Sequence, residues 1–255
     1  MKFHRHVGID YAGGKTPLDE VDGIEVYWSE GGAEPSRKQR PPDAAGRIPG
    51  WTRSSLAHWI QDLVDDNKSF VLGIDHAFSF PLPYLDAFGL ANWGDFLDDF
   101  CEHWPTRGDN ATVKALRQGN QRTGDPAWFR LAERWTRTAK SVFRFNVKGQ
   151  VAYSTHAGIP WLKWLRDAAG DRLQFWPFDG WKKGGKQVVA EVYPALFKSR
   201  FPLPNVTEHQ QDAYAVAKWL RQMDEAGALD FFLDPPLSCA EREVAEREGW
   251  ILGVV

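Results

Sequence analysis

Two short apolar runs that each end in an aspartate constrain the fold of this chain more than any other feature. Residues 7–10 read Val-Gly-Ile-Asp, and residues 71–75 read Val-Leu-Gly-Ile-Asp. Short continuous apolar runs of this kind are typical of strands that are covered on both faces, as in a parallel sheet. We therefore expect an α/β protein in which Asp10 and Asp75 follow two buried strands.

The rest of the chain predicts a mixed sheet flanked by helices. Strands are expected at residues 3–10, 23–28, 70–74 and 187–193, and residues 31–50 read as a loop or a weak third strand. The first two strands can pair as a hairpin. Apolar residues recur at helical spacing in residues 52–67, 92–103, 125–137 and 159–169, from Thr207 onward, and from Ser238 onward. Thr207 with Gln210 matches a capping box. Residues 84–170 form a mainly helical insertion.

Length and composition favour a single domain without a membrane span. A chain of 255 residues can form one large domain or two small ones, and we take residues 1–255 as one domain. No apolar run approaches the roughly 18 residues of a membrane helix, and the basic start of the chain lacks the apolar core of a secretion signal. Cys101 and Cys239 have no zinc-binding spacing. We expect a cytoplasmic protein; the sequence leaves its oligomeric state open.

Several acidic residues stand where the pattern places them in the interior. Glu191 interrupts an apolar strand, and Asp212 precedes apolar residues at helical spacing, which puts it on the inward stripe of its helix. His209 lies three residues before Asp212 on the same face. Each group has an ordinary explanation, such as a helix cap or an ion pair with arginine. Together with Asp10 and Asp75 they favour a shared cation, because a buried carboxylate is costly without a partner.

The chemistry that uses such a cluster is two-metal phosphoryl transfer. Hard divalent cations, Mg²⁺ or Mn²⁺, take oxygen ligands, and two such ions lie about 3.5–4 Å apart in these sites. Neighbouring strands are about 4.8 Å apart, so carboxylates at adjacent strand ends can share them. We expect Asp10, Asp75, Glu191 and Asp212 as metal ligands, with His209 as a further catalytic residue.

Several segments resemble the DUF429 family of predicted nucleases, a branch of the ribonuclease H-like superfamily. They are Val7–Asp10, Gly73–Asp75, Glu191–Pro194, His209–Ala213, Lys140–Phe143, Trp176–Asp179 and Gly249–Ile251, which span nearly the whole chain. The His-x-x-Asp-Ala segment also resembles the last motif of RuvC-type junction nucleases, which implies that His209 and Asp212 complete a metal site. This chain departs from those nucleases by carrying Asp75 where they usually have glutamate. The resemblance implies a ribonuclease H-like sheet and a metal-dependent nuclease.

The charge of the chain is unevenly distributed. Residues 59–102 contain nine acidic residues and one lysine, whereas residues 107–148 contain ten basic and three acidic residues. The basic segment also carries aromatic side chains, a composition that can bind phosphates and stack on bases. The candidates for nucleic-acid contact are Arg117, Arg122, Arg137, Lys140 and Arg144. The alternative is a solvated helix with Arg130, Arg134 and Arg137 outward and Trp128, Leu131 and Trp135 in the core.

Two other functions fit the same pattern. An actin-like phosphotransferase has a related core, and Gly13-Gly14-Lys15-Thr16 after Asp10 could hold a nucleotide phosphate. That function predicts a second glycine-rich loop after a later strand, and the segment from Asp75 to Phe78 is not one. A non-catalytic nucleic-acid-binding module with the same fold is the third possibility.

Overall fold

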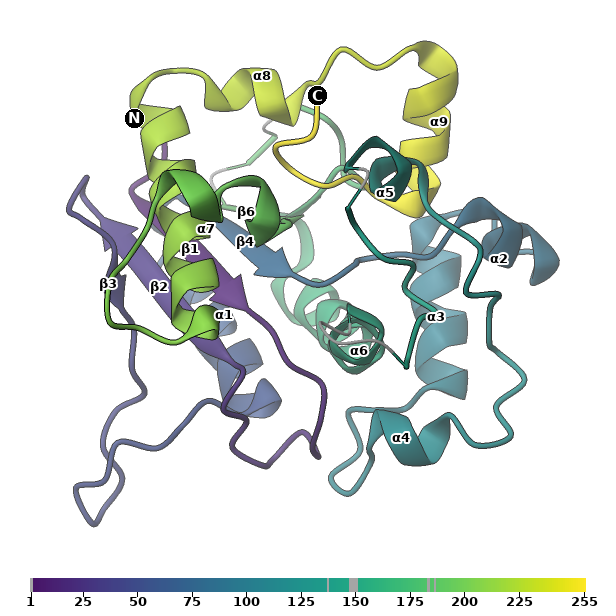
Figure 1. Ribbon diagram of the computed structural model, residues 1–255, viewed down its shortest axis with the longest axis horizontal. Helices are drawn as coiled ribbons and strands as arrows, with labels where there is room; N and C mark the ends of the chain where they lie inside the picture. Colours follow the sequence, from purple (N-terminus) through teal and green to yellow (C-terminus); the bar gives the residue numbers. More distant parts are fainter. Residues whose placement is uncertain (1, 137, 147–150, 183, 186) are drawn as a thin grey trace.

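A mixed sheet, six-stranded among the described residues, forms the centre of the computed structural model, which describes residues 2–136, 138–146, 151–182, 184–185 and 187–255 (Figure 1). The strands are β1 (Arg5–Asp10), β2 (Glu25–Glu30), β3 (Ser36–Arg37), β4 (Phe70–Asp75), β5 (Gln174–Trp176) and β6 (Gln187–Glu191). Their order is β3-β2-β1-β4-β6-β5. β2 runs antiparallel to β1 and β3, and the pairs β1–β4, β4–β6 and β5–β6 are parallel. The expected mixed α/β sheet and its first hairpin are confirmed.

Helices cover both faces of this sheet. They are α1 (Arg53–Asp65), α2 (Leu82–Ala87), α3 (Trp93–His103), α4 (Val113–Leu116), α5 (Leu131–Thr136), α6 (Val151–Ala169), α7 (Glu208–Glu225), α8 (Leu229–Leu233) and α9 (Cys239–Glu248). Short 3-10 turns are η1 (Gly170–Arg172), η2 (Pro194–Leu196) and η3 (Lys198–Arg200). In Figure 1, α7 crosses in front of β1 and β2, and α2, α3 and α4 lie to one side of the sheet. No helix of the described segments is both long and apolar enough to cross a bilayer.

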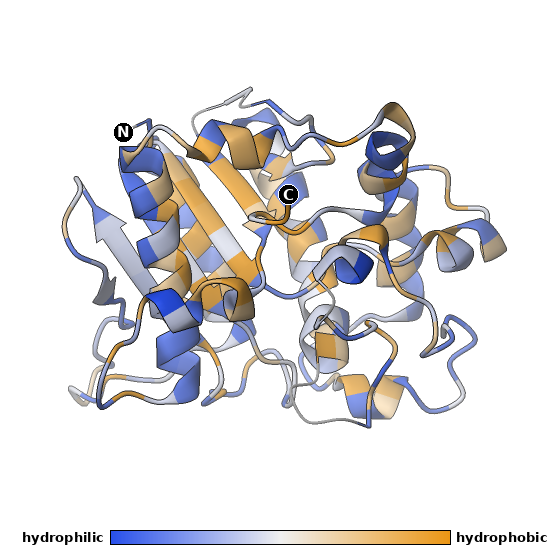
Figure 2. Ribbon diagram, turned by 45° about the horizontal axis from the view of Figure 1, so that its top comes forward, coloured by the Kyte–Doolittle hydropathy of each residue, from blue (hydrophilic) through white to orange (hydrophobic). Residues whose placement is uncertain are grey.

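The alternation of side chains along the strands divides the core between two faces. Val7, Ile9 and Leu72 pack with apolar side chains of α1 and α6. Val71 and Val188 pack on the opposite face with side chains of α7. Successive residues of a strand point to opposite faces, so a strand that is apolar throughout must be covered on both. Figure 2 shows the apolar residues concentrated along these central strands.

Two glycines let α7 lie directly on the sheet. Gly8 and Gly73 are register partners in β1 and β4. A Cβ atom on Gly8 would lie 2.2 Å from the backbone oxygen of Ala213 in α7, and one on Gly73 would lie 2.6 Å from Cγ1 of Val192 and 2.9 Å from Cγ1 of Val216. Any larger residue would push the helix away. Because Asp10 and Asp75 stand two residues further along the same strands, they point to the same face, toward α7.

The predicted helix starts are confirmed where a cap is present. Thr52 caps α1 and forms a capping box with Ser55, and Thr207 forms the expected capping box with Gln210 at the start of α7. Each box satisfies backbone N–H groups that a helix start would otherwise leave without a partner. Ser238 caps α9 in the same way. The start of α1 and the start of α7 are therefore determined by residues that are close in the sequence.

Two predicted helices have the wrong bounds. The helix expected at residues 125–137 is reduced to α5, because the Asp125 side chain accepts a hydrogen bond from the Ala127 N–H (2.8 Å) and folds this segment into a turn. The helix expected at residues 159–169 is longer than predicted and begins at Val151. Gly158 stands just before the predicted start, and it lies inside α6 together with Pro160. A Cβ atom on Gly158 would lie 2.4 Å from the His76 ring, so this glycine makes room for that ring.

Candidate functional site

Asp10 and Asp75 lie side by side at the carboxyl ends of the two central parallel strands. They are register partners, and their side chains share a hydrogen bond. Burial raises the pKa of Asp75 well above its usual value, and the negative charges of Asp10, Asp212 and Glu191 raise it further. Burial also raises the pKa of Asp10, although His209 and Asp75 oppose that effect. Burial and the neighbouring negative charges therefore favour the protonated form of Asp75 over its ionised form.

His209 holds the other side of the Asp10 carboxylate. Its Nδ1 lies 2.6 Å from Asp10 Oδ2, and because a carboxylate can only accept, the ring donates this hydrogen bond. The bond and the charge of Asp10 raise the pKa of His209, while partial burial acts against them. His209 stands in the first turn of α7, so the capping box at Thr207 sets the position of the ring. The helix thus connects to the end of β1 across nearly 200 residues of chain.

Asp212 comes from the next turn of α7 and faces the same cleft. Its Oδ1 is buried and has no hydrogen bond to the described residues, and Lys198 Nζ of η3 lies 3.3 Å from it. Burial raises the pKa of Asp212, Lys198 acts to lower it, and the charge of Asp10 adds to the rise. The predicted inward position agrees with the buried residues Ala215, Val216 and Trp219 further along α7. Asp10, Asp75 and Asp212 thus converge from three elements.

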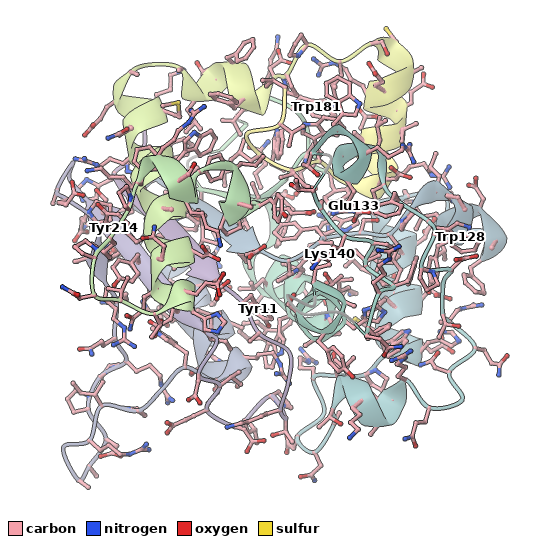
Figure 3. All side chains as sticks on the ribbon, in the orientation of Figure 1. Tyr11, Trp128, Glu133, Lys140, Trp181 and Tyr214 are labelled. Carbon is pink, nitrogen blue, oxygen red and sulfur yellow. The ribbon has the colours of Figure 1, made fainter. Side chains whose placement is uncertain are left out.

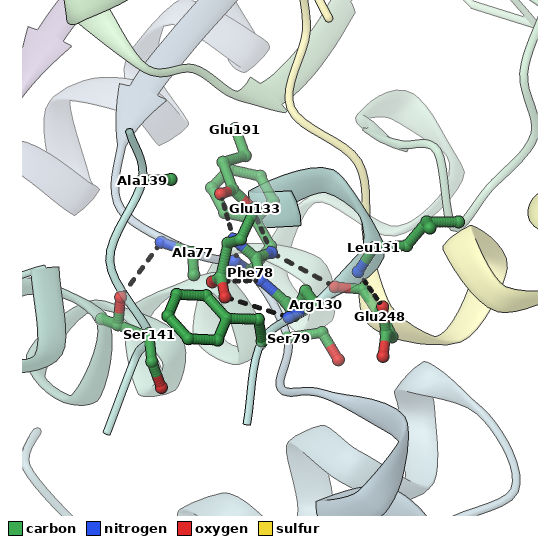
Figure 4. A network of polar contacts seen from close by, with 12 residues as sticks. Ala77, Phe78, Ser79, Arg130, Leu131, Glu133, Ala139, Ser141, Glu191 and Glu248 are labelled. Carbon is green, nitrogen blue, oxygen red and sulfur yellow. Dashed lines mark hydrogen bonds and ion pairs between the residues drawn. The ribbon is translucent and has the colours of Figure 1, made fainter. Parts of the chain in front are cut away.

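Glu191 lines the same cleft but its carboxylate is occupied. The register pairs Glu191 with Ile74, one residue before Asp75, so its side chain leaves the sheet on the opposite face. There Arg130 donates to both oxygens, with Nη2–Oε1 at 2.5 Å and Nη1–Oε2 at 2.7 Å (Figure 4). The Phe78 N–H adds a third hydrogen bond. Glu191, expected as a metal ligand, is instead held in a buried ion pair.

Arg130 is the centre of a wider buried network, drawn in Figure 4. It also donates from Nε to Glu133 (2.8 Å) and from Nη1 to the backbone oxygen of Glu248 (3.2 Å). Glu248 in turn accepts from the Leu131 N–H (2.5 Å). The expectation of an outward Arg130 is wrong, because its side chain is 1% exposed. Trp135, expected in the core, is 37% exposed.

The cleft that contains these groups has a volume of about 930 Å³. Its walls come from the turn after β1, the segment before α6, the turns η2 and η3, and the first turns of α7. Besides the acids it is lined by Lys140, Lys198 and the aromatic side chains of Tyr11, Tyr153 and Tyr193. Figure 3 shows Tyr11 and Lys140 near the centre of the molecule. The cleft therefore combines acidic, basic and aromatic walls.

The predicted nucleic-acid contacts divide into three groups. Arg122 is bound by Asp99 (2.7 Å) and stacks over Phe88, and Arg117 lies 4.3 Å from the centre of the Phe145 ring. The Arg144 guanidinium lies 5.9 Å from the ring centre of Phe129. Among these candidates Lys140 lines the cleft. Arg137 falls outside the described residues.

The glycine segment after β1 is not arranged as a phosphate loop. A Cβ atom on Gly13 would lie 2.0 Å from the Tyr153 backbone oxygen, so this glycine allows close contact with α6. Lys15 donates to the Glu20 backbone oxygen (2.9 Å), and the Thr16 hydroxyl donates to Asp19 (2.7 Å). Both side chains that would bind a phosphate therefore have intramolecular partners.

The donor set fits a hard divalent cation in part. Asp10, Asp75 and Asp212 supply carboxylate oxygens, and the buried Oδ1 of Asp212 lacks a hydrogen bond. Glu191 does not fit, because Arg130 takes both of its oxygens. No three His, Cys, Asp or Glu side chains of the described segments are spaced as a ready-made metal site.

Comparison with protein-family models, with curated proteins and with solved structures gave no match. The geometry of the cleft therefore carries the functional interpretation.

Proposed function

We propose that this protein hydrolyses phosphodiester bonds in nucleic acid with the help of a divalent cation, Mg²⁺ or Mn²⁺. One observation carries the proposal: Asp10 and Asp75 meet in register at the carboxyl ends of the central parallel strands, and α7 places Asp212 and His209 beside them. Ligand sites of open α/β sheets lie at this edge. We also propose a ribonuclease H-like sheet, since antiparallel β3, β2 and β1 lead into parallel β4, β6 and β5.

The charge of the cleft supports a cation. Burial and the negative charges of Asp10 and Asp212 raise the pKa of Asp75, and burial and the charge of Asp10 raise that of Asp212. A divalent cation would neutralise this concentration of negative charge, and carboxylate oxygens are the ligands that Mg²⁺ and Mn²⁺ prefer. When bound, such a cation neutralises charge on a phosphate and lowers the pKa of a bound water.

The side chains around the acids supply the remaining functions. Lys140 and Lys198 line the cleft and would attract the phosphate backbone. His209 keeps Asp10 oriented through Nδ1, and the raised pKa of His209 favours its protonated form, which can donate a proton to a departing oxygen. The half-buried Tyr153 and Tyr193 of the cleft offer surfaces for stacking against bases.

A cleavage screen tests the proposal. Purified protein is incubated with junction DNA, single-stranded DNA, duplex DNA, RNA and RNA–DNA hybrid, in the presence of Mg²⁺, Mn²⁺ or EDTA. We expect cleavage of at least one substrate that requires the metal and is lost in Asp10→Asn. Asp62→Asn, which changes an exposed aspartate of α1, should cleave like the wild type. Cleavage that persists in EDTA or in Asp10→Asn, or no cleavage of any substrate, would refute the nuclease.

A further inference from the structure

The acidic side chains of the cleft differ in the positively charged partners that bind them in the structure. Glu191 is bound by Arg130 on both oxygens, and these two side chains are 5% and 1% exposed. A metal ion on Glu191 would leave the Arg130 guanidinium in the interior with one carboxylate fewer. Removing one member of a buried ion pair is strongly unfavourable. Glu191 is therefore unavailable to a cation.

Asp212 is matched by a lysine that belongs to the cleft wall. Lys198 Nζ lies 3.3 Å from Asp212 Oδ1 and 3.2 Å from Glu208 Oε1. Two acids of α7 therefore hold the ammonium group from the same side. Turn η3, which carries Lys198, also packs against α7, so the lysine and its acids are presented by neighbouring elements. A lysine ammonium is a compact point charge, and it can stand where a metal ion would otherwise neutralise a carboxylate.

Asp10 and Asp75 differ, because no lysine or arginine of the described segments forms an ion pair with either of them, and Asp10 is paired with His209. Their carboxylates belong to adjacent strands in register, which brings their backbones to about 4.8 Å. His209 Nδ1 contacts one oxygen of Asp10, Oδ2. Asp10 and Asp75 can therefore accept a divalent cation without breaking a buried ion pair with arginine or lysine.

We propose that the cleft holds one divalent cation, between Asp10 and Asp75, and that Lys198 takes the place of a second cation at Asp212. This inference rests on the proposed metal-dependent function, and it replaces the two-metal site expected from the sequence with a one-metal site. Lys198 then has two tasks: it neutralises Asp212 and presents an ammonium group to a phosphate oxygen of the substrate.

Binding stoichiometry tests the inference without any activity measurement. Mn²⁺ is titrated into the protein by calorimetry, and electron paramagnetic resonance reports whether bound ions are isolated or magnetically coupled. We expect one isolated ion in the wild type and in Lys198→Arg. In Lys198→Met the Asp212 carboxylate loses its lysine partner, and we expect a second Mn²⁺ ion that is magnetically coupled to the first. Circular dichroism confirms that each variant is folded.

A matched control uses another lysine and aspartate pair. Lys163 binds Asp167 on the surface of α6, outside the cleft, and Lys163→Met should retain one ion. Two coupled ions in the wild type would overturn the inference and leave the proposed function intact. One ion in Lys198→Met would refute the role of Lys198. No bound Mn²⁺ in the wild type would refute the metal site itself, and with it the proposed function.

Discussion

The carboxyl group of Asp75 is desolvated by the surrounding protein and lies near the negative charges of Asp10, Asp212 and Glu191. Because its pKa in the folded protein is raised, the native state binds more protons than the unfolded state above the unfolded pKa of about 3.9. Stability therefore falls as the pH rises from about 3.9 through the folded pKa of Asp75.

The first prediction concerns Asp75→Asn. The amide removes a carboxyl group that resists ionisation, so we expect the metal-free protein to gain about 0.5–2 kcal/mol in free energy of unfolding at pH 7. Urea denaturation measures this gain, with Asp62→Asn as the control. Addition of Mn²⁺ should raise the Tm of the wild type but not of Asp75→Asn. Equal or lower stability of Asp75→Asn would show that the repulsion is relieved in another way.

Two buried histidines make the protein sensitive to acid. Burial lowers the pKa of His76 to about 4 and that of His156 to about 3. The unfolded chain takes up these protons near pH 6.5, so stability is lost as the pH falls below 6.5 until the folded groups also titrate. His209 acts in the opposite direction: its raised pKa stabilises the protein at low pH, and this contribution is lost as the pH rises through its folded pKa.

The second prediction isolates His156, which packs among Phe80, Trp104 and Phe145. The phenylalanine of His156→Phe binds no proton in either the folded or the unfolded state. The loss of unfolding free energy between pH 7 and pH 5 should therefore be about 2 kcal/mol smaller than in the wild type. Urea denaturation at the two pH values measures this difference. An unchanged pH dependence would mean that His156 is protonated in the native state.

At the scale of elements, the position of α7 depends on the glycine pair beneath it. The third prediction is that Gly8→Ala lowers the free energy of unfolding by about 1–3 kcal/mol, because the new methyl group overlaps the Ala213 backbone and forces α7 outward. Gly14→Ala is the control, since a Cβ atom there meets nothing within 4 Å, and it should change stability by less than about 0.5 kcal/mol. Urea denaturation measures the free energy of unfolding of both variants. Similar losses in Gly8→Ala and Gly14→Ala would contradict the prediction.

Elements with local signals were predicted from the sequence, and elements held by tertiary contacts were not. The apolar runs of β1 and β4 and the caps at Thr52 and Thr207 act within a few residues. β5 is only three residues long and is stabilised by its pairing with β6. No local sequence pattern therefore predicts it. The start of α6 was missed because Gly158 is tolerated inside the helix, where it makes room for the His76 ring.

At the scale of the whole molecule, Arg130 connects parts of the chain that are distant in sequence. Its partners Glu191 and Glu248 lie 61 and 118 residues away, on β6 and α9. Through Glu248, which also accepts from Leu82 N–H, the network reaches α2. The Arg130 guanidinium thus helps to hold strand β6 of the sheet to α9 and, through Glu248, to α2.

The fourth prediction is that Arg130→Met lowers the free energy of unfolding by about 3–5 kcal/mol, because Glu133 and Glu191 remain buried without their counter-ion. The triple variant Arg130→Met, Glu133→Gln, Glu191→Gln should recover much of this loss, since the uncompensated charges are removed. Thermal and urea unfolding compare the three proteins. A triple variant no more stable than the single one would show that the network acts through geometry and not charge.

The register of the parallel strands explains which parts of the site could be predicted from the sequence. Asp10 and Asp75 follow matching Gly-Ile-Asp segments, and the register of two parallel strands follows from that match. Aligning Gly73 with Ala190 would also have shown that Val192, not Glu191, occupies the position equivalent to Asp75. Lys198 and Arg130 carry no such signal, because their partners are fixed by the packing of separate elements.

The contact between Gly8 and α7 also has a consequence during synthesis. The ribosome releases β1 first and α7 about two hundred residues later, and domains generally fold as units. Until α7 is released, the face of β1 and β4 that carries both aspartates stays uncovered, without Asp212, His209 or the wall they form. An unfinished chain therefore presents nucleic acid with two aspartates but no cleft, and the proposed activity begins with the completed protein.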